Sequence, residues 1–130
     1  MIFVMSVSQL FSNALLVDGS GAPAVTDAAL RVERGVITHV GTVNDVASWP
    51  DSDETIDVAG APLVPGYIDI HHHGGGRVAY DDGLEAAAAT SHPARAIGVD
   101  DKFGTLAAGY PGDVIVLDPE TLLPKGIFFV

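Results

Sequence analysis

The run Asp113-Val114-Ile115-Val116-Leu117-Asp118 is the clearest strand signal in this sequence. Four consecutive apolar residues, three of them β-branched, stand between two aspartates. A strand that shows no alternation of apolar and polar residues is typically buried on both faces. We therefore expect residues 113–118 at the centre of a sheet, with neighbouring strands drawn from the first 60 residues.

The residues before this strand, 1–66, form short β-rich runs separated by Gly, Pro and Asp. One apolar run ends at Asp18-Gly19, two runs flank Arg34-Gly35 as in a hairpin, and a further run alternates apolar and polar residues. This pattern predicts antiparallel strands with one solvent-exposed face. The runs are Leu10–Val17, Ala29–Glu33, Val36–Val40 and Glu54–Val58.

On both sides of residues 113–118 the sequence predicts further elements. Gly104–Leu106 is expected as a short edge strand, Gly109–Gly112 as a turn and Ile127–Val130 as a last strand. One or two short helices are expected between residues 82 and 98.

The first of these helices covers Leu84–Thr90, with Asp82 as its cap. In the second, Ser91 or His92 precedes Pro93 at the first helical position, and Gly98 ends the helix.

Length and charge exclude several classes of protein. A chain of 130 residues fits one compact unit, whereas a complete (β/α)8 barrel needs about 250. Six Lys and Arg against 17 Asp and Glu give a net charge of −11, which argues against nucleic acid and anionic membranes as partners. Cys is absent, so thiol chemistry is excluded. No apolar stretch is long enough to span a bilayer, and we expect a cytoplasmic protein.

His71 and His73 are the candidate metal ligands. They lie two residues apart at the end of an expected strand, Tyr67–Ile70, so both imidazoles lie on one face and could share one ion. The alternatives are a polar strand end with solvated histidines or part of an affinity tag, although the run is internal and only three residues long. His72 is expected on the opposite face, and His92 reads as a helix-start residue.

Two ordered motifs resemble one known family. Residues 63–74, Leu-Val-Pro-Gly-Tyr-Ile-Asp-Ile-His-His-His-Gly, look like the end of the first barrel strand in the amidohydrolase superfamily. Residues 71–76 with Tyr80-Asp81-Asp82 resemble the N-acetylglucosamine-6-phosphate deacetylases, particularly the actinobacterial type. Residues 91–99 and 104–118 look like the closing segment of that family.

The resemblance implies a composite fold. In the family a metal-dependent (β/α)8 barrel separates the two motifs, but only 17 residues lie between His73 and Ser91 here. The expected fold is therefore mainly β and has no complete barrel. It is a small β-sandwich built from residues 1–66 and 99–130, with 67–98 as the barrel remnant. Loss of the barrel exposes an apolar face, in keeping with 48% hydrophobic residues, and we expect a homo-oligomer through that face.

The resemblance also implies a reaction, the metal-dependent hydrolysis of an acetamide in an amino-sugar phosphate. The family's other ligands and its proton-transferring Asp have no counterpart by motif, so no catalytic residue is assigned. We expect His71 and His73 to bind zinc weakly and the chain to be inactive alone. A small metal- or partner-binding module, and an amidohydrolase whose site a second subunit completes, stay as alternatives.

Overall fold

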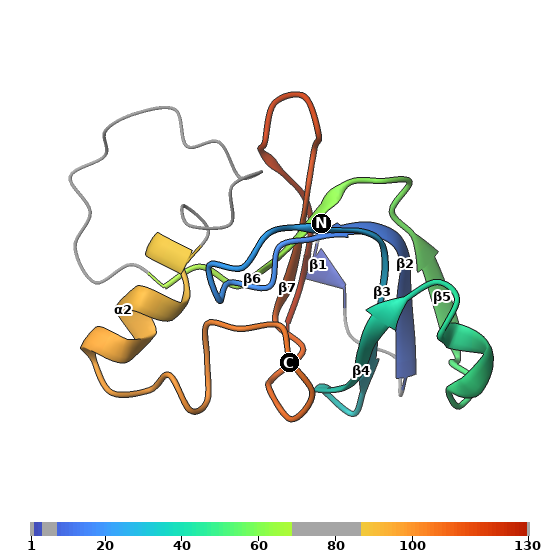
Figure 1. Cartoon of the computed structure of the whole chain (residues 1–130), viewed down its shortest axis with the longest axis horizontal. Helices are drawn as coiled ribbons and strands as arrows, with labels where there is room; N and C mark the ends of the chain where they lie inside the picture. The colour runs from blue at the N-terminus through green and yellow to red at the C-terminus, as the bar shows by residue number, and fades with distance from the viewer. Residues whose placement is uncertain (1, 4–7, 69–86, 130) are drawn as a thin grey trace.

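The computed structural model describes residues 2–3, 8–68 and 87–129, which form a mainly β structure (Figure 1). In Figure 1 the helix α2 lies at one end of the sheet and β5 at the other. The mainly β fold expected from the sequence is confirmed. The elements are β1 (Ile2–Phe3), β2 (Ser8–Leu16), β3 (Val25–Glu33), β4 (Val36–Thr42), the 3₁₀ turn η1 (Val46–Ser48), β5 (Glu54–Asp57), β6 (Pro62–Pro65), α2 (Ser91–Ala96), β7 (Val114–Leu117) and β8 (Pro124–Phe128).

Segments from both ends of the sequence share one sheet. The strand order is β1-β8-β7-β6-β2-β3-β4, and β5 pairs with β2 beside this path. β6 pairs with β7, and β1 pairs with β8. Strands from the N-terminal and C-terminal segments therefore lie in one sheet, as expected, and the described strands do not close into a barrel.

The strand β7 lies inside the sheet, as its apolar run predicts. Its four residues are all buried, because Val114 and Val116 face one apolar cluster while Ile115 and Leu117 face another. The prediction that the strands next to β7 come from the first 60 residues was wrong. They are β6 and β8, since the stretch just past residue 60 is as apolar as β7 and pairs with it.

The strand β2 organises the N-terminal half of the sheet. Along one edge it pairs with β3, and along the other it pairs first with β5 and then with β6. The ladder shifts register around Asn13, whose φ of 53° lies in the left-handed region. Both β5 and β6 run parallel to β2, so the expectation of a purely antiparallel arrangement was wrong. Because the β3–β4 hairpin lies between β2 and β5 in the sequence, the chain comes back beside β2 running in the same direction as β2.

The β3–β4 hairpin was predicted correctly. Arg34 and Gly35 both have positive φ, 49° and 79°, as a two-residue hairpin turn requires. The residues on either side pair as Glu33 with Val36.

The sheet curls so that distant strands pack against each other. Phe11 of β2 and Phe128 of β8 meet edge to face with ring centroids 4.9 Å apart, although β6 and β7 lie between these strands in the hydrogen-bonded order. Strands about 4.8 Å apart would put the two rings roughly 14 Å apart in a flat sheet. A single curved sheet therefore encloses the main core, where a sandwich of separate sheets was expected. That core contains Phe11, Ala14, Leu16, Ala28, Leu30, Val32, Ile37, Leu63, Leu106 and Phe128, among others.

The helix α2 ends as predicted but begins differently. The helix ends in a Schellman motif at Gly98, whose φ is 74°. In this motif the Val99 amide donates to the Ala94 carbonyl at 2.9 Å. The helix begins at Ser91 after Thr90, so Pro93 is its third residue and not its first. Proline is tolerated throughout a first helical turn, because the amide there has no intrahelical partner.

Three further expected elements differ from the structure or lie partly outside the described residues. Gly104–Leu106 forms no strand, because Gly104 is held in a left-handed turn. The last strand begins earlier, at Pro124. Tyr67 and Ile68 are not in a strand, and residues 69–86 lie outside the description. Of the other expected helix, Leu84–Thr90, the described part is helical at Ala87 and Ala88 and forms a turn at Ala89 and Thr90. Among the described residues no helix is long and apolar enough to span a bilayer.

Candidate functional site

The predicted metal ligands His71 and His73 lie outside the described residues, as do Asp69, His72 and residues 74–86. Within residues 2–3, 8–68 and 87–129 no group of three or more His, Asp or Glu side chains could hold a metal ion. The metal site therefore stays a prediction, and no reaction step is derived from it. His92 lies exposed in the first turn of α2, in keeping with its interpretation as a helix-start residue.

The backbone on both sides of residues 69–86 is described, and the two sides meet. After the buried strand β6, the Gly66 amide donates to the Asp113 carbonyl at 3.0 Å. The Ile68 amide then donates to the Ala89 carbonyl at 2.9 Å. The described backbone just before residues 69–86 is therefore hydrogen-bonded to the described backbone just after them.

A second contact between distant segments, here called the closing junction, joins Asp18-Gly19, Thr90-Ser91 and Gly104–Leu106. The Ser91 hydroxyl donates to the Gly19 carbonyl at 2.6 Å in a buried setting. The Leu106 amide donates to the Asp18 carbonyl at 2.9 Å. The turn that ends β2 is therefore hydrogen-bonded to both C-terminal motifs.

Two glycines allow the closing junction to pack this tightly. Gly104 has a φ of +94°, and a Cβ added there would lie 2.8 Å from the Thr90 carbonyl oxygen. Gly19 has a φ of +84°, and its Cβ would lie 2.8 Å from the Thr90 hydroxyl and collide with the Gly104 carbonyl. Both positions need glycine for conformation and for space. Sequence reasoning missed this junction; its only signal was the Asp-Gly pair that ends the first long apolar run.

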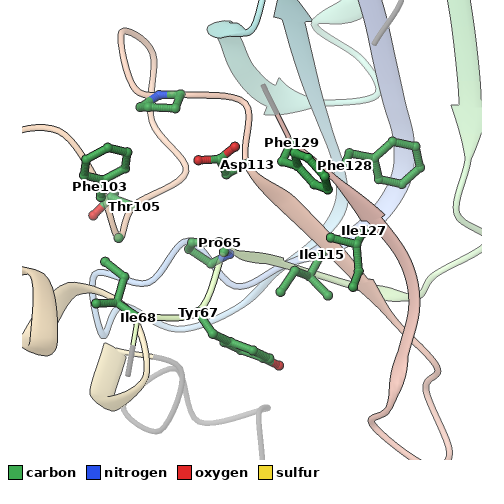
Figure 2. A pocket seen from close by; sticks show the side chains of 13 residues that line it. Pro65, Tyr67, Ile68, Phe103, Thr105, Asp113, Ile115, Ile127, Phe128 and Phe129 are labelled. Atoms are coloured by element: carbon green, nitrogen blue, oxygen red, sulfur yellow. The ribbon is translucent and has the colours of Figure 1, made fainter. Parts of the chain in front are cut away.

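An open apolar groove of about 540 Å³ adjoins the point where residues 69–86 are attached. Figure 2 shows Phe103 and Thr105 on one side, Ile127 and Phe129 on the other, and Tyr67 with Ile68 below them. Four of its large apolar side chains remain solvent-exposed, by 41% to 46% of their area. They are Tyr67, Phe103, Ile127 and Phe129. The groove fits the size range of small-molecule sites; the described side chains that line it are mostly apolar, with Thr105 and Asp113 among the polar ones.

Three aspartates outside this groove, the exposed Asp45 and Asp57 and the half-buried Asp118, have a lowered pKa. The pKa of Asp57 is lowered first by a hydrogen bond from the Asn13 side chain and then by one from the Ala59 amide. The pKa of Asp45 is lowered mainly by the Thr42 amide, and that of Asp118 mainly by the Thr121 amide. Asp45 and Asp118 accept these hydrogen bonds within local turns, whereas Asp57 also accepts one from Asn13 on the neighbouring strand β2.

The buried charge of Arg31 is structural. Its side chain, 3% exposed, lies 3.0 Å from the Glu33 carboxylate. It also donates to the Thr38 hydroxyl at 3.1 Å and to the Asp51 carbonyl at 3.0 Å. Arg31 thereby fixes the loop before β5 against the β3–β4 hairpin.

Comparison with known proteins gives partial matches. The model of the amidohydrolase family matches residues 76–130. The chain is 41% identical over 51 residues to imidazolonepropionase from Bacillus cereus (strain ZK / E33L), covering 39% of this chain and 12% of that protein. The chain therefore spans about an eighth of the length of this curated relative.

Among solved structures, an N-acetylglucosamine-6-phosphate deacetylase from Pasteurella multocida is 26% identical, with a TM-score of 0.40, over 59% of this chain and 19% of that one. A D-aminoacylase is 35% identical, with a TM-score of 0.42, over 50% of this chain and 13% of that one. An N-acyl-D-glutamate deacylase from Bordetella bronchiseptica, in complex with zinc, is 28% identical, with a TM-score of 0.42, over 52% of this chain and 13% of that one. The family match supports the amidohydrolase superfamily as the group to which residues 76–130 of this chain are related.

Proposed function

We propose that this chain is the composite β domain of a metal-dependent amidohydrolase that resembles the N-acetylglucosamine-6-phosphate deacetylases, with most of the catalytic barrel missing. Residues 1–66 and 99–130 form the domain, and residues 67–98 are the barrel remnant. By itself the chain hydrolyses no amide. The β domain is folded, and residues 67–98 are all that remains of the catalytic barrel.

The observation that carries this proposal is the hydrogen bond from Ile68 to Ala89. Because the described positions on the two sides of residues 69–86 lie next to each other, a segment of different length between them would need no movement of β6, β7 or α2. The family match to residues 76–130 and the much greater length of the relatives support an insertion of very different size at this place.

Ligand count supports the absence of catalysis. Hydrolysis by a metal-bound hydroxide needs about three protein ligands, an open coordination position and an acid for the leaving amine. In the sequence only His71 and His73 carry a ligand motif, and no residue is assigned as the acid. Two imidazoles without a third fixed ligand hold zinc weakly and in no defined geometry.

Zinc binding and acetate release test the two parts of the proposal. The purified chain is titrated with zinc by calorimetry and assayed for acetate release from N-acetylglucosamine 6-phosphate. His71→Ala and His73→Ala are compared with the matched control His92→Ala, which removes an exposed histidine of α2. We expect weak zinc binding that is lost in the first two variants and kept in the third, with no acetate release from any of them.

Two results would contradict this assignment. Turnover that His71→Ala abolishes would show that the site is completed, for example by a second subunit. Tight stoichiometric zinc binding without turnover would instead favour the reading of the chain as a small metal-binding module.

A further inference from the structure

We propose that His39 is a proton-sensitive contact that holds the loop between β4 and β5, residues 43–53, against β4. The ring of His39 lies against the ring of Trp49 in this loop, with centroids 5.2 Å apart and planes inclined by 33°. Both side chains are half-buried. When the His39 ring takes up a proton from solvent, its contact with the loop becomes stronger.

The loop packs closely on β3 and β4. A Cβ added to Gly41 of β4 would lie 3.0 Å from a carbon of the Trp49 ring, so this ring covers the backbone of β4. Further along the loop, the Asp51 carbonyl accepts a hydrogen bond from the buried Arg31 of β3 at 3.0 Å. Trp49 therefore ties the middle of the loop to β4, and Arg31 ties its end to β3.

A bulge in β4 brings a hydroxyl to the His39 ring. Val32 pairs with Ile37 and Arg31 pairs with His39, so Thr38 is the extra residue in β4. In a regular strand these two successive side chains would lie on opposite faces. At the bulge the Thr38 hydroxyl instead lies 3.0 Å from Nδ1 of His39.

The contacts of the Thr38 hydroxyl assign a hydrogen to Nδ1 of His39. This hydroxyl accepts from Nη1 of Arg31 at 3.1 Å and donates to the Arg31 carbonyl at 3.3 Å. A hydroxyl has a single hydrogen, so its third contact, with Nδ1, needs a hydrogen on the ring. The other ring nitrogen, Nε2, is then the atom that gains or loses a proton when the pH changes.

A proton on Nε2 strengthens two contacts of the His39 ring. The hydrogen bond from Nδ1 to Thr38 becomes charge-assisted. The charged ring also attracts the π face of Trp49, and the separation of 5.2 Å lies within the roughly 6 Å over which a cation–π contact acts. Protonation therefore favours the position that the loop has in this structure.

The charges on the elements next to His39 are mostly negative. The charged residues of β3 and of the loop are Asp27, Arg31, Glu33, Asp45, Asp51 and Asp53. The one cation among them, Arg31, shares the Thr38 hydroxyl with His39, but the Glu33 carboxylate lies 3.0 Å from its guanidinium. A positive charge on His39 is therefore placed among acids, and the repulsion from Arg31 is offset.

Acrylamide quenching of Trp49 fluorescence, with lifetimes measured in parallel, tests the proposal. Trp49 is the single Trp of the chain, so the whole signal reports on this contact, and acrylamide carries no charge. We expect the bimolecular quenching constant to fall about two- to fivefold between about pH 8 and pH 5.5, where histidine changes its charge and most carboxylates stay ionised. His39→Gln should abolish this dependence. His92→Gln, the matched control, removes an exposed histidine of α2 and should keep it.

Three results would overturn the proposal. They are a quenching constant that does not change with pH in the unsubstituted chain, the same pH dependence in His39→Gln, and a constant that rises at low pH because Arg31 repels the protonated ring. Should His39→Gln fail to fold, NMR of the unsubstituted chain decides. The ring signals of His39 and Trp49 should then shift with one common midpoint, and separate midpoints would contradict the coupling. These measurements are made without zinc or substrate, so the proposed function is tested separately.

Discussion

Replacing Ser91 with alanine tests whether the closing junction holds the two ends of the sequence together. The Ser91 hydroxyl is buried and donates to the Gly19 carbonyl, 72 positions away, at 2.6 Å. Alanine fits the space but leaves this buried carbonyl without that donor, which costs about 1–3 kcal/mol. With a urea m value of about 2 kcal/mol/M, a loss of about 2 kcal/mol lowers the unfolding midpoint by roughly 1 M.

Ser48→Ala is the matched control for this change. The Ser48 hydroxyl also donates to a backbone carbonyl, that of Asp45, at 2.7 Å, but this bond is exposed to solvent and local. Water replaces the lost donor there, so the free energy of unfolding should change by no more than about 0.5 kcal/mol. Urea unfolding followed by fluorescence or circular dichroism measures both variants. Equal midpoints for Ser91→Ala and Ser48→Ala would refute the claim that the junction stabilises the fold.

Three further predictions concern other parts of the fold. Gly104→Ala should prevent folding, because the added Cβ would collide with the Thr90 backbone. Gly109→Ala is the control, with nearly the same φ of +92° but nothing within 4 Å of the added Cβ, and should lose only about 1–2 kcal/mol of stability for the left-handed conformation. Expression and thermal unfolding compare the two variants, and equal losses would contradict the steric argument. The lowered pKa of Asp57 means that its contribution to stability is present above the ordinary value of 3.8 and is lost as the pH falls through the folded-state value. Asp57→Ala should therefore destabilise the chain at pH 7 but hardly at pH 2, and urea unfolding at both pH values should show this difference shrink. Arg31→Met should cost about 1–3 kcal/mol through lost buried hydrogen bonds; the loss should persist in 1 M salt, and a loss that salt abolishes would mean that the exposed Glu33 charge dominates.

Local sequence signals were sufficient where one residue type decides the conformation. The apolar run of β7 requires burial on both faces, and Arg34-Gly35 supplies the positive φ that a tight hairpin needs. Gly98 likewise ends α2 through the Schellman bonds. In these cases the neighbours along the chain determine the structure, and the prediction was confirmed.

Signals failed where partners far apart in the sequence decide the structure. Gly104–Leu106 has the composition of an edge strand, yet the Thr90 backbone, against which Gly104 packs, holds it in a turn. The direction of β5 relative to β2 depends on how the chain returns after the β3–β4 hairpin, and an alternating pattern carries no information on it. For His71 and His73 the motif is clear, but the third ligand that decides between a site and a pair of solvated rings is not encoded nearby.

The hydrogen bond between Ile68 and Ala89 also has a consequence for the evolution of such proteins. Joining two fixed ends with a flexible chain has an entropic cost that grows only with the logarithm of its length, about 0.6 kcal/mol for each doubling. Replacing the roughly 20 residues between these positions with about 300, a little under four doublings, would add only about 2.4 kcal/mol. A connection between these two backbone positions can therefore differ greatly in length at a small entropic cost, while the strands on either side keep their pairing.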